Sequence, residues 1–155
     1  FKFEENHIRN VLKNYKFTNN RLITRSLITW YAFTFKDQKL PVSGSSGFDI
    51  EHIYAKERQN KEKKLLNPEN LEELGNKILL EKSINIRASD YRFEDKKKYY
   101  FGYEDASGKK HPGSMILEFK NITQLDDFSE EEICERNKII HDKFIKYLEE
   151  EGLLR

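Results

Sequence analysis

The chain has 155 residues, of which 37% are hydrophobic and 35% are charged, and its formal net charge is +1 at pH 7. This length fits one domain with a modest core, and the nearly neutral charge gives no general support for nucleic-acid binding. The single cysteine, Cys134, excludes an internal disulfide framework and a cysteine-based zinc site. No apolar run approaches the ~20 residues that span a bilayer, so we expect a soluble, cytoplasmic protein that does not contact membranes.

The first 40 residues are predicted to be helical. Apolar side chains recur at helical spacing over residues 3–15, and again over residues 22–34, where Asn19 or Asn20 is suited to cap the helix. Because the chain begins at Phe1 and its only methionine is Met115, we also expect it to be part of a longer protein.

A short strand is predicted where the sequence alternates between apolar and polar residues, from 48 to 53. Its apolar residues can face a core, while Asp49 and Glu51 share the opposite face and His52 falls where the strand should end. The charged stretch 55–66 is predicted to lie on the surface, either as a short helix or as a mobile insertion.

A second strand is predicted at residues 77–80, after a helix that starts at Asn67-Pro68. This strand can pair with the first one, and residues 81–85 begin the next helical segment. The two strands and that helix form a predicted ββα unit within residues 48–100.

Toward the C-terminus, Ser89 or Asp90 is suited to cap a helix that ends near residue 100. Residues 104–113 are polar and rich in glycine and proline, which predicts a loop. A long helix is predicted over residues 129–151, with Arg136 as a buried tie between this helix and the core.

The stretch around the two strands has the chemistry of a one-metal phosphodiesterase site. A neutral imidazole is a competent base near neutral pH, which makes His52 the candidate to activate water. Carboxylate and amide oxygens suit a partly hydrated Mg²⁺ ion, and Glu51 and Asn85 are the candidate donors. Asn76 can hydrogen-bond backbone across the connecting loop and so hold the shape of the site.

Taken alone, Glu51-His52 also fits an ordinary exposed dipeptide, and the joint pattern decides between the two interpretations. Residues 49–53, 74–80 and 83–85 resemble the HNH (His-Me finger) endonucleases. In particular, they are similar to the HNH domain at the C-terminal end of GmrSD-like, modification-dependent restriction enzymes. The nine-residue interval from Asn76 to Asn85 is the most specific part of this resemblance.

The resemblance implies a role for each matching residue. His52 would activate water, Asn76 would order the loop, and Glu51 and Asn85 would bind the metal, with Asp49 as a second-choice ligand or a group behind the ligands. The implied cofactor is Mg²⁺, with Mn²⁺ as a substitute, and the implied products carry 5′-phosphate and 3′-hydroxyl ends.

Two features depart from the pattern of the family. Many relatives have a proline two residues after the histidine, where this chain has Tyr54. The interval of 24 residues from His52 to Asn76 is longer than in compact HNH domains, so residues 55–66 would be an insertion. The resemblance extends from Phe48 to the C-terminus, and the N-terminal helices match only loosely.

Local clusters of positive charge are the candidates for DNA contacts. The run Lys96-Lys97-Lys98 and the side chains of Arg87 and Arg92 can approach backbone phosphates. Lys61, Lys63 and Lys64 are interleaved with acidic residues, and a solvated face is the favoured interpretation there. The remaining histidines, His7, His111 and His141, have no partner pattern and are expected to be structural or exposed.

Together these features predict one α+β domain over residues 1–155, a ββα-metal core embedded in a mostly helical domain. The predicted function is Mg²⁺-dependent DNA cleavage in a restriction or phage-defence system. The resemblance also implies an N-terminal NTPase-like domain or subunit. The alternatives are a non-catalytic module that keeps the nuclease fold to bind nucleic acid or protein, and a nuclease that acts on RNA.

Overall fold

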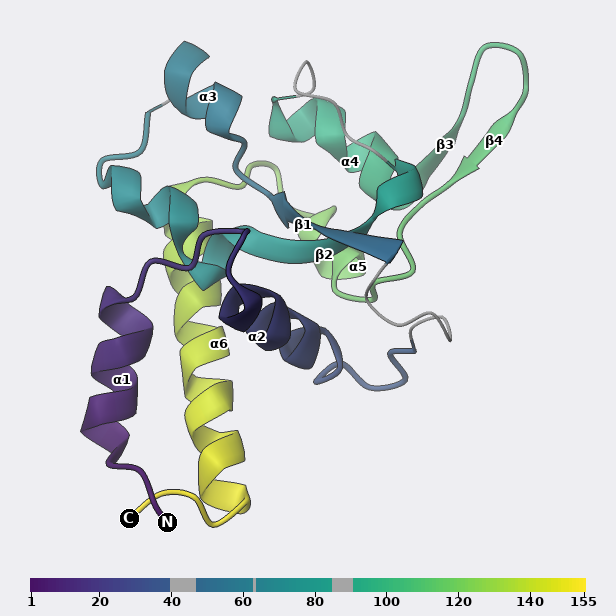
Figure 1. Cartoon of the computed structure of the whole chain (residues 1–155). Coiled ribbons are helices and arrows are strands. Elements are labelled where there is room, and N and C mark those ends of the chain that lie inside the picture. The colour runs from purple at the N-terminus through teal and green to yellow at the C-terminus, as the bar shows by residue number, and fades with distance from the viewer. Residues whose placement is uncertain (40–46, 63, 85–90) are drawn as a thin grey trace.

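A computed structural model describes residues 1–39, 47–62, 64–84 and 91–155 of the chain (Figure 1). Two small antiparallel sheets lie among helices, which confirms the predicted α+β class. In chain order the elements are α1 (Glu5–Asn14), α2 (Leu22–Ala32), β1 (Phe48–His52), α3 (Lys56–Lys61), the 3₁₀-helices η2 (Pro68–Glu72) and η3 (Leu74–Asn76), β2 (Lys77–Glu81), the 3₁₀-helix η4 (Lys82–Ile84), α4 (Phe93–Phe101), β3 (Gly102–Glu104), β4 (Lys110–Pro112), α5 (Phe119–Ile122) and α6 (Glu130–Glu150). None of the helices in these ranges is long and apolar enough to cross a membrane.

The two predicted strands of the site form one antiparallel pair. In its register, Ile50 lies opposite Leu79 and His52 lies opposite Lys77. Along β1 the apolar residues are buried and Asp49 is exposed, as the alternation predicts. Residues 77–80 of β2 are all buried, because elements pack against both faces of the pair. Figure 1 shows the pair at the centre of the molecule, between α2 and α4.

The two ends of the chain meet beside the long helix α6. The backbone N–H of Phe3 donates to the carbonyl of Leu153 at 2.7 Å, and the N–H of Arg155 donates back to the carbonyl of Phe3 at 3.1 Å. Figure 1 shows α1 alongside α6, with both termini at the same end. The predicted helices at residues 3–15 and 129–151 are thereby confirmed and packed on each other.

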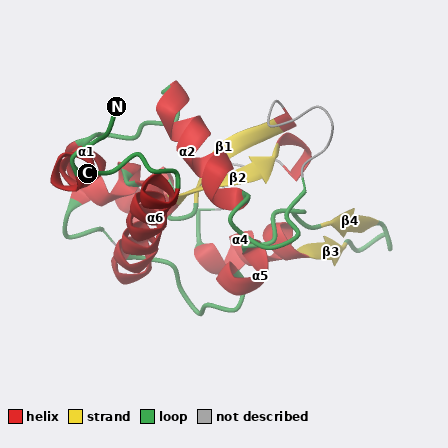
Figure 2. Ribbon diagram, turned by 90° about the horizontal axis from the view of Figure 1, so that it is seen from below, coloured by secondary structure: helices red, strands yellow, loops and turns green. Residues whose placement is uncertain are grey.

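The predicted loop at residues 104–113 was wrong, because β3 and β4 form a hairpin there. Asp105 closes its turn, with one carboxylate oxygen accepting hydrogen bonds from the backbone N–H groups of Ser107 (2.9 Å) and Lys109 (3.0 Å). Gly108 adopts a φ of +84°, which glycine tolerates without strain. Figure 2 shows the hairpin projecting away from the other elements. Strands of three residues are too short to show a period-two pattern in the sequence.

The asparagine cap that was predicted for the second helix was also wrong. The N-cap of α2 is Arg21, and Asn19 instead donates a hydrogen bond to the carbonyl of Ile50 at 3.0 Å. The predicted helix start at Asn67-Pro68 is confirmed, because Asn67 is the N-cap residue of η2 and Pro68 lies in its first turn. This helix is a 3₁₀-helix, and the Asn67 side chain makes no capping hydrogen bond. Ser89 and Asp90, predicted to cap the helix at α4, lie outside the described residues.

The charged stretch after β1 holds the short helix α3, which is anchored rather than lying wholly on the surface. Arg58 is buried, and its guanidinium group donates to the carbonyl of Phe128 at 3.1 Å and to Asp127 at 2.9 Å. The many charged residues of 55–66 indicate a surface position. They do not indicate that one of these cations, Arg58, has partners about 70 residues away along the chain.

Arg136 of α6 is buried, as predicted, and ties α6 to the start of β2. Its guanidinium group forms two hydrogen bonds with the carboxylate of Glu118, at 2.6 and 2.8 Å, and donates to the carbonyl of Lys77 at 2.6 Å and of Gly75 at 2.9 Å. Gly75 has no room for a Cβ, which would lie 2.6 Å from the backbone nitrogen of Asn137. The close approach of η3 to α6 therefore requires a glycine at this position.

Replacing Arg136 with methionine should destabilise the domain by about 3–5 kcal/mol, because the Glu118 carboxylate would stay buried without its cation. Urea denaturation followed by circular dichroism measures the change. Lys138→Met is the matched control on the same helix, where Lys138 is 80% exposed and pairs with Asp142 at 2.8 Å. That control should change stability by about 0.5 kcal/mol or less, and equal effects of the two variants would contradict the role of Arg136.

Candidate active site

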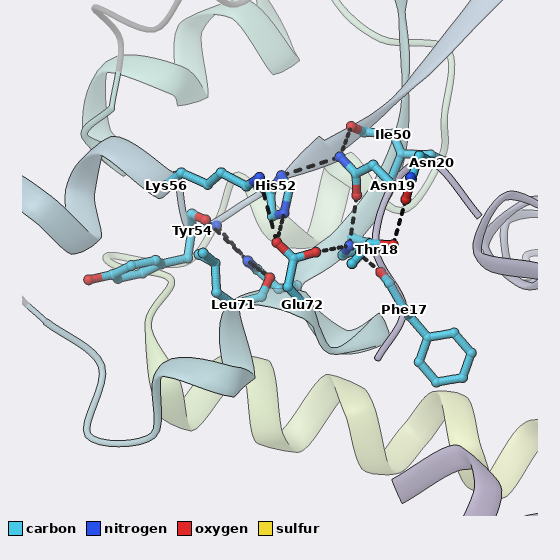
Figure 3. Close-up of polar contacts among 12 residues, drawn as sticks. Phe17, Thr18, Asn19, Asn20, Ile50, His52, Tyr54, Lys56, Leu71 and Glu72 are labelled. Atoms are coloured by element: carbon cyan, nitrogen blue, oxygen red, sulfur yellow. Dashed lines mark hydrogen bonds and ion pairs between the residues drawn. The ribbon is translucent and has the colours of Figure 1, made fainter. Parts of the chain in front are cut away.

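His52 is held at both ring nitrogens at the end of β1. Its Nε2 atom lies 3.1 Å from Oε1 of Glu72, and its Nδ1 atom lies 3.3 Å from Nδ2 of Asn19 (Figure 3). The side chains of His52 and Glu72 are only 11% and 12% exposed. The imidazole ring is therefore fixed in position between two polar side chains rather than free to rotate in solvent.

Lys77 lies directly opposite His52 in the strand register and is completely buried. Its ammonium group donates to Oε2 of Glu72 at 2.7 Å, to Oδ1 of Asn19 at 2.7 Å and to the carbonyl of Phe17. An ammonium group has three donors, and these three acceptors match them one for one. Burial lowers the pKa of Lys77, and its contact with Glu72 opposes that shift.

Glu72 connects the histidine to the lysine. The hydrogen bond from His52 and the hydrogen bond and charge of Lys77 lower the pKa of this carboxyl group from 4.5 to about 2, against the opposing effect of burial. Lys56 adds a weaker ion pair at 3.8 Å from an exposed position. Glu72 is therefore a carboxylate throughout the neutral range, and its negative charge favours a hydrogen bond from the imidazole N–H.

Glu51 points to the other face of the strand pair, where α4 packs. Its Oε2 atom accepts a hydrogen bond from the hydroxyl of Tyr100 at 3.2 Å and lies 3.4 Å from Nζ of Lys96. The same Lys96 ammonium donates to the carbonyl of His52 at 2.7 Å. The side chains of Glu51 and His52 point to opposite faces of the strand. Lys96 nevertheless links them, because its ammonium group contacts both the Glu51 carboxylate and the backbone carbonyl of His52.

A polar hollow of about 360 Å³ lies beside this part of β1. It is lined by Asp49 and Glu51 from β1, by Glu81 from β2, and by Asn19 and Arg25 from the N-terminal part of the chain. Asn19 thus lines the hollow and also contacts the ring of His52. The hollow brings carboxylate oxygens, an amide and a guanidinium group to the same opening.

Asn76 is completely buried and makes the backbone hydrogen bonds across the connecting loop that its position suggested. Its side-chain oxygen accepts from the N–H of Tyr54 at 2.7 Å, and its amide nitrogen donates to the carbonyls of Tyr54 (3.1 Å) and Leu71 (2.9 Å). Its own carbonyl accepts from the N–H of Ile53 at 3.0 Å. Asn76 therefore fixes where the chain goes after His52.

The predicted phosphate-binding cations differ in their surroundings. Lys96 is 3% exposed and turned toward the strand end, as described above. Lys97 pairs with Glu94 at 3.2 Å, and Arg92 is an exposed side chain 3.5 Å from Glu62. The predicted metal ligand Asn85 and the predicted phosphate contact Arg87 lie outside the described residues.

The described residues do not form a complete metal site. Among them, no group of three or more His, Cys, Asp and Glu side chains lies close enough to hold an ion. Glu51 and Asp49 nevertheless offer carboxylate oxygens to one hollow, and hard oxygen donors fit Mg²⁺, which keeps several water ligands when it binds to proteins. The Lys96 ammonium is a competitor for the same Glu51 oxygen.

Sequence reasoning missed Asn19, Glu72 and Lys77. For Lys77 a signal was present, because the residue is in phase with the apolar residue Leu79 on a predicted strand and a buried lysine requires partners. For Glu72 and Asn19 there was no local signal, since they lie 20 and 33 residues from His52 along the chain.

These features define a strand pair that ends in a histidine hydrogen-bonded to a carboxylate, and Asn19 contacts this histidine and also lines an acidic hollow. This is the arrangement of a candidate hydrolytic site. A family model described as "GmrSD restriction endonucleases, C-terminal domain" matches residues 2–143. The chain therefore belongs to this family and is a nuclease domain of the restriction-endonuclease class. Searches of curated proteins and of solved structures gave no significant match.

The extent of the family match corrects one expectation from the sequence. The resemblance was expected to run from Phe48 to the C-terminus, with the N-terminal helices matching only loosely. The family model instead matches residues 2–143, which includes both of these helices and ends within α6. The structure gives a physical reason, since Asn19 follows α1 and contacts His52. The N-terminal part is thus in contact with the candidate site.

Glu72→Gln should destabilise the domain by about 1–3 kcal/mol at pH 7 by removing a charged hydrogen-bond acceptor. Because the folded-state pKa lies below the ordinary value, the stability that Glu72 contributes is fully present above pH 4.5 and is lost as the pH falls toward 2. Urea denaturation at pH 7 and pH 3.5 should show the difference between wild type and variant narrowing at the lower pH. A difference that does not change with pH would contradict the ion-pair assignment.

Proposed function

We propose that this domain is an HNH-type DNA endonuclease in which His52 is the general base. The single observation that carries the proposal is the fixed imidazole at the end of β1, bonded through Nε2 to a carboxylate that is always ionised near neutral pH. Such a ring can accept a proton from water while its other nitrogen stays hydrogen-bonded. The family assignment supports the same chemistry, because it describes restriction endonucleases.

In the proposed reaction, water loses a proton to His52 as its oxygen attacks the phosphorus atom of a phosphodiester bond. The carboxylate of Glu72 stabilises the imidazolium that forms. The bond between phosphorus and the 3′-oxygen breaks, and that oxygen takes a proton from a solvent water to become the 3′-hydroxyl. Asn76 keeps the backbone after His52 in place through its bonds to Tyr54 and Leu71. These residues hold the base and accept the proton.

The proposed cofactor is Mg²⁺, with Mn²⁺ as a substitute. Glu51 is the principal carboxylate ligand in this proposal, Asn85 supplies the second donor, and Asp49 is a second-choice ligand at the same hollow. When bound, the ion would supply positive charge for the phosphate oxygens and the leaving group. The oxygen chemistry of Glu51 and Asp49 supports this choice of a hard cation over zinc.

The proposed substrate is DNA, cleaved within a restriction or phage-defence system. Lys97, Arg92 and Arg87 are proposed as backbone phosphate contacts, and Lys96 is proposed to reach a phosphate only if it leaves Glu51. Selection of modified or foreign DNA would belong to an N-terminal NTPase-like domain or subunit. The alternative function is a non-catalytic binding module. The ion pair between Lys96 and Glu51 favours this alternative, because the proposed nuclease needs the Glu51 carboxylate to bind the metal.

Nicking of supercoiled plasmid in the presence of Mg²⁺ tests the base. His52→Ala should lower the rate by about 10²- to 10⁴-fold, which is the usual contribution of a general base. His7→Ala is the matched control, because His7 is exposed on α1, and it should cut at the wild-type rate. Undiminished cutting by His52→Ala would make the base assignment wrong, and labelled RNA competing in the same assay tests the choice of substrate.

Calorimetric titration with Mg²⁺ and Mn²⁺ tests the ligands. Glu51→Gln and Asn85→Ala should each weaken binding at least tenfold, on the scale of losing an important metal contact. Glu131→Gln, a change of an exposed carboxylate on α6, should leave the affinity unchanged. Wild-type affinity in the Glu51 variant would remove it as a ligand and favour the non-catalytic module.

A further inference from the structure

The hydrogen-bond network around His52 determines which way the Asn19 amide faces. Its Oδ1 atom lies 2.7 Å from the ammonium of Lys77, which can only donate. Its Nδ2 atom lies 3.0 Å from the carbonyl of Ile50, which can only accept. Both neighbours require the same orientation, so the side-chain NH₂ group of Asn19 is the part that faces His52 (Figure 3).

This orientation decides the tautomer of the histidine. Nδ1 lies 3.3 Å from a donor, and it can take part in that contact only if it carries no proton. Nε2 lies 3.1 Å from the Glu72 carboxylate, which can only accept, so Nε2 carries the proton. The two contacts lie on opposite sides of the ring and agree with each other.

We propose that Lys77, acting through Asn19, together with Glu72, holds His52 as the Nε2–H tautomer, so that Nδ1 is the nitrogen that takes the proton from water. The second half of this statement rests on the proposed function, and the first half does not. Asn19, Lys77 and Glu72 are positioning residues, since they act through the base rather than on the substrate. Asn19, the neighbour of Nδ1, also lines the acidic hollow.

The 3.3 Å contact between Nδ2 of Asn19 and Nδ1 of His52 is long for a hydrogen bond, and it uses only one of the two hydrogens of the Asn19 amide. The other hydrogen is used by the carbonyl of Ile50 at 3.0 Å. A water that replaces Asn19 at Nδ1 therefore leaves the amide anchored by Ile50 and Lys77. The network can release the lone pair of Nδ1 without losing its own orientation.

The first experiment is ¹⁵N NMR of the histidine-labelled, metal-free protein at pH 8, where the nitrogen shifts distinguish protonated from unprotonated ring positions. The chain has four histidines, and the His52 signals are assigned by their loss in His52→Gln. We expect Nε2 protonated and Nδ1 unprotonated in the wild type. A proton on Nδ1 of the wild-type protein would overturn the proposal. Apart from His52→Gln, which is used for the assignment, this experiment needs only the wild-type protein.

The second experiment compares two substitutions of Asn19 that a purely structural role would rank in the opposite order. Asn19→Asp keeps an acceptor for Lys77 but replaces the NH₂ donor by an oxygen, which should put a proton on Nδ1. Asn19→Ala loses the Lys77 contact but puts no new group at Nδ1. We expect kcat for plasmid nicking to fall about 10- to 100-fold in Asn19→Ala and further in Asn19→Asp, while urea denaturation finds the aspartate variant the more stable of the two.

Asn20→Asp is the matched control, because it makes the same charge change one residue away and keeps an acceptor for the hydroxyl of Thr18 at 2.6 Å. It should retain the wild-type spectrum and rate.

If Asn19→Asp cuts faster than Asn19→Ala, Asn19 is structural and the proposal fails. If the predicted tautomer is found but the protein does not cut DNA, the proposed function is wrong. If the protein cuts while Nδ1 is protonated, that function stands and this inference is overturned.

Discussion

A buried ammonium group at the start of β2 is the interaction on which the candidate site depends. Removing a charge from water is costly unless hydrogen-bond partners replace the water, so Lys77 requires all three of its acceptors. They come from the segment after α1 and from η2, in the form of Phe17, Asn19 and Glu72. Lys77 therefore forces these two segments to converge on the strand end where His52 lies.

A second buried cation, Arg136, contacts the backbone of Lys77. Arg136 of α6 binds the carbonyl of Lys77 while the side chain of Lys77 binds the N-terminal segment. The first residue of β2 is thus the place where the N-terminal and C-terminal parts of the chain meet. The family match over residues 2–143 includes both of these parts of the chain.

Local patterns in the sequence were enough to predict the elements in which apolar residues recur over several turns of a helix or several residues of a strand. The strand pair, the helices at α1 and α6 and the burial of Arg136 follow from periods of two and 3.6 residues, which reflect which face meets the core. The hairpin β3–β4 was missed because its strands have three residues each. The asparagine cap before α2 was misassigned because Asn19 has better partners far away, at Ile50 and Lys77.

The sequence by itself determined that a histidine ends a strand, that a carboxylate precedes it, and that an asparagine is suited to hydrogen-bond backbone across the connecting loop. Tertiary structure alone decided what each of these groups touches. Glu51 meets Lys96 and Tyr100, separated from it by 45 and 49 residues, and His52 meets Asn19 and Glu72 on the other face. Alternation along a strand sets the face of a side chain, but its hydrogen-bond partners depend on which distant segments fold against that face.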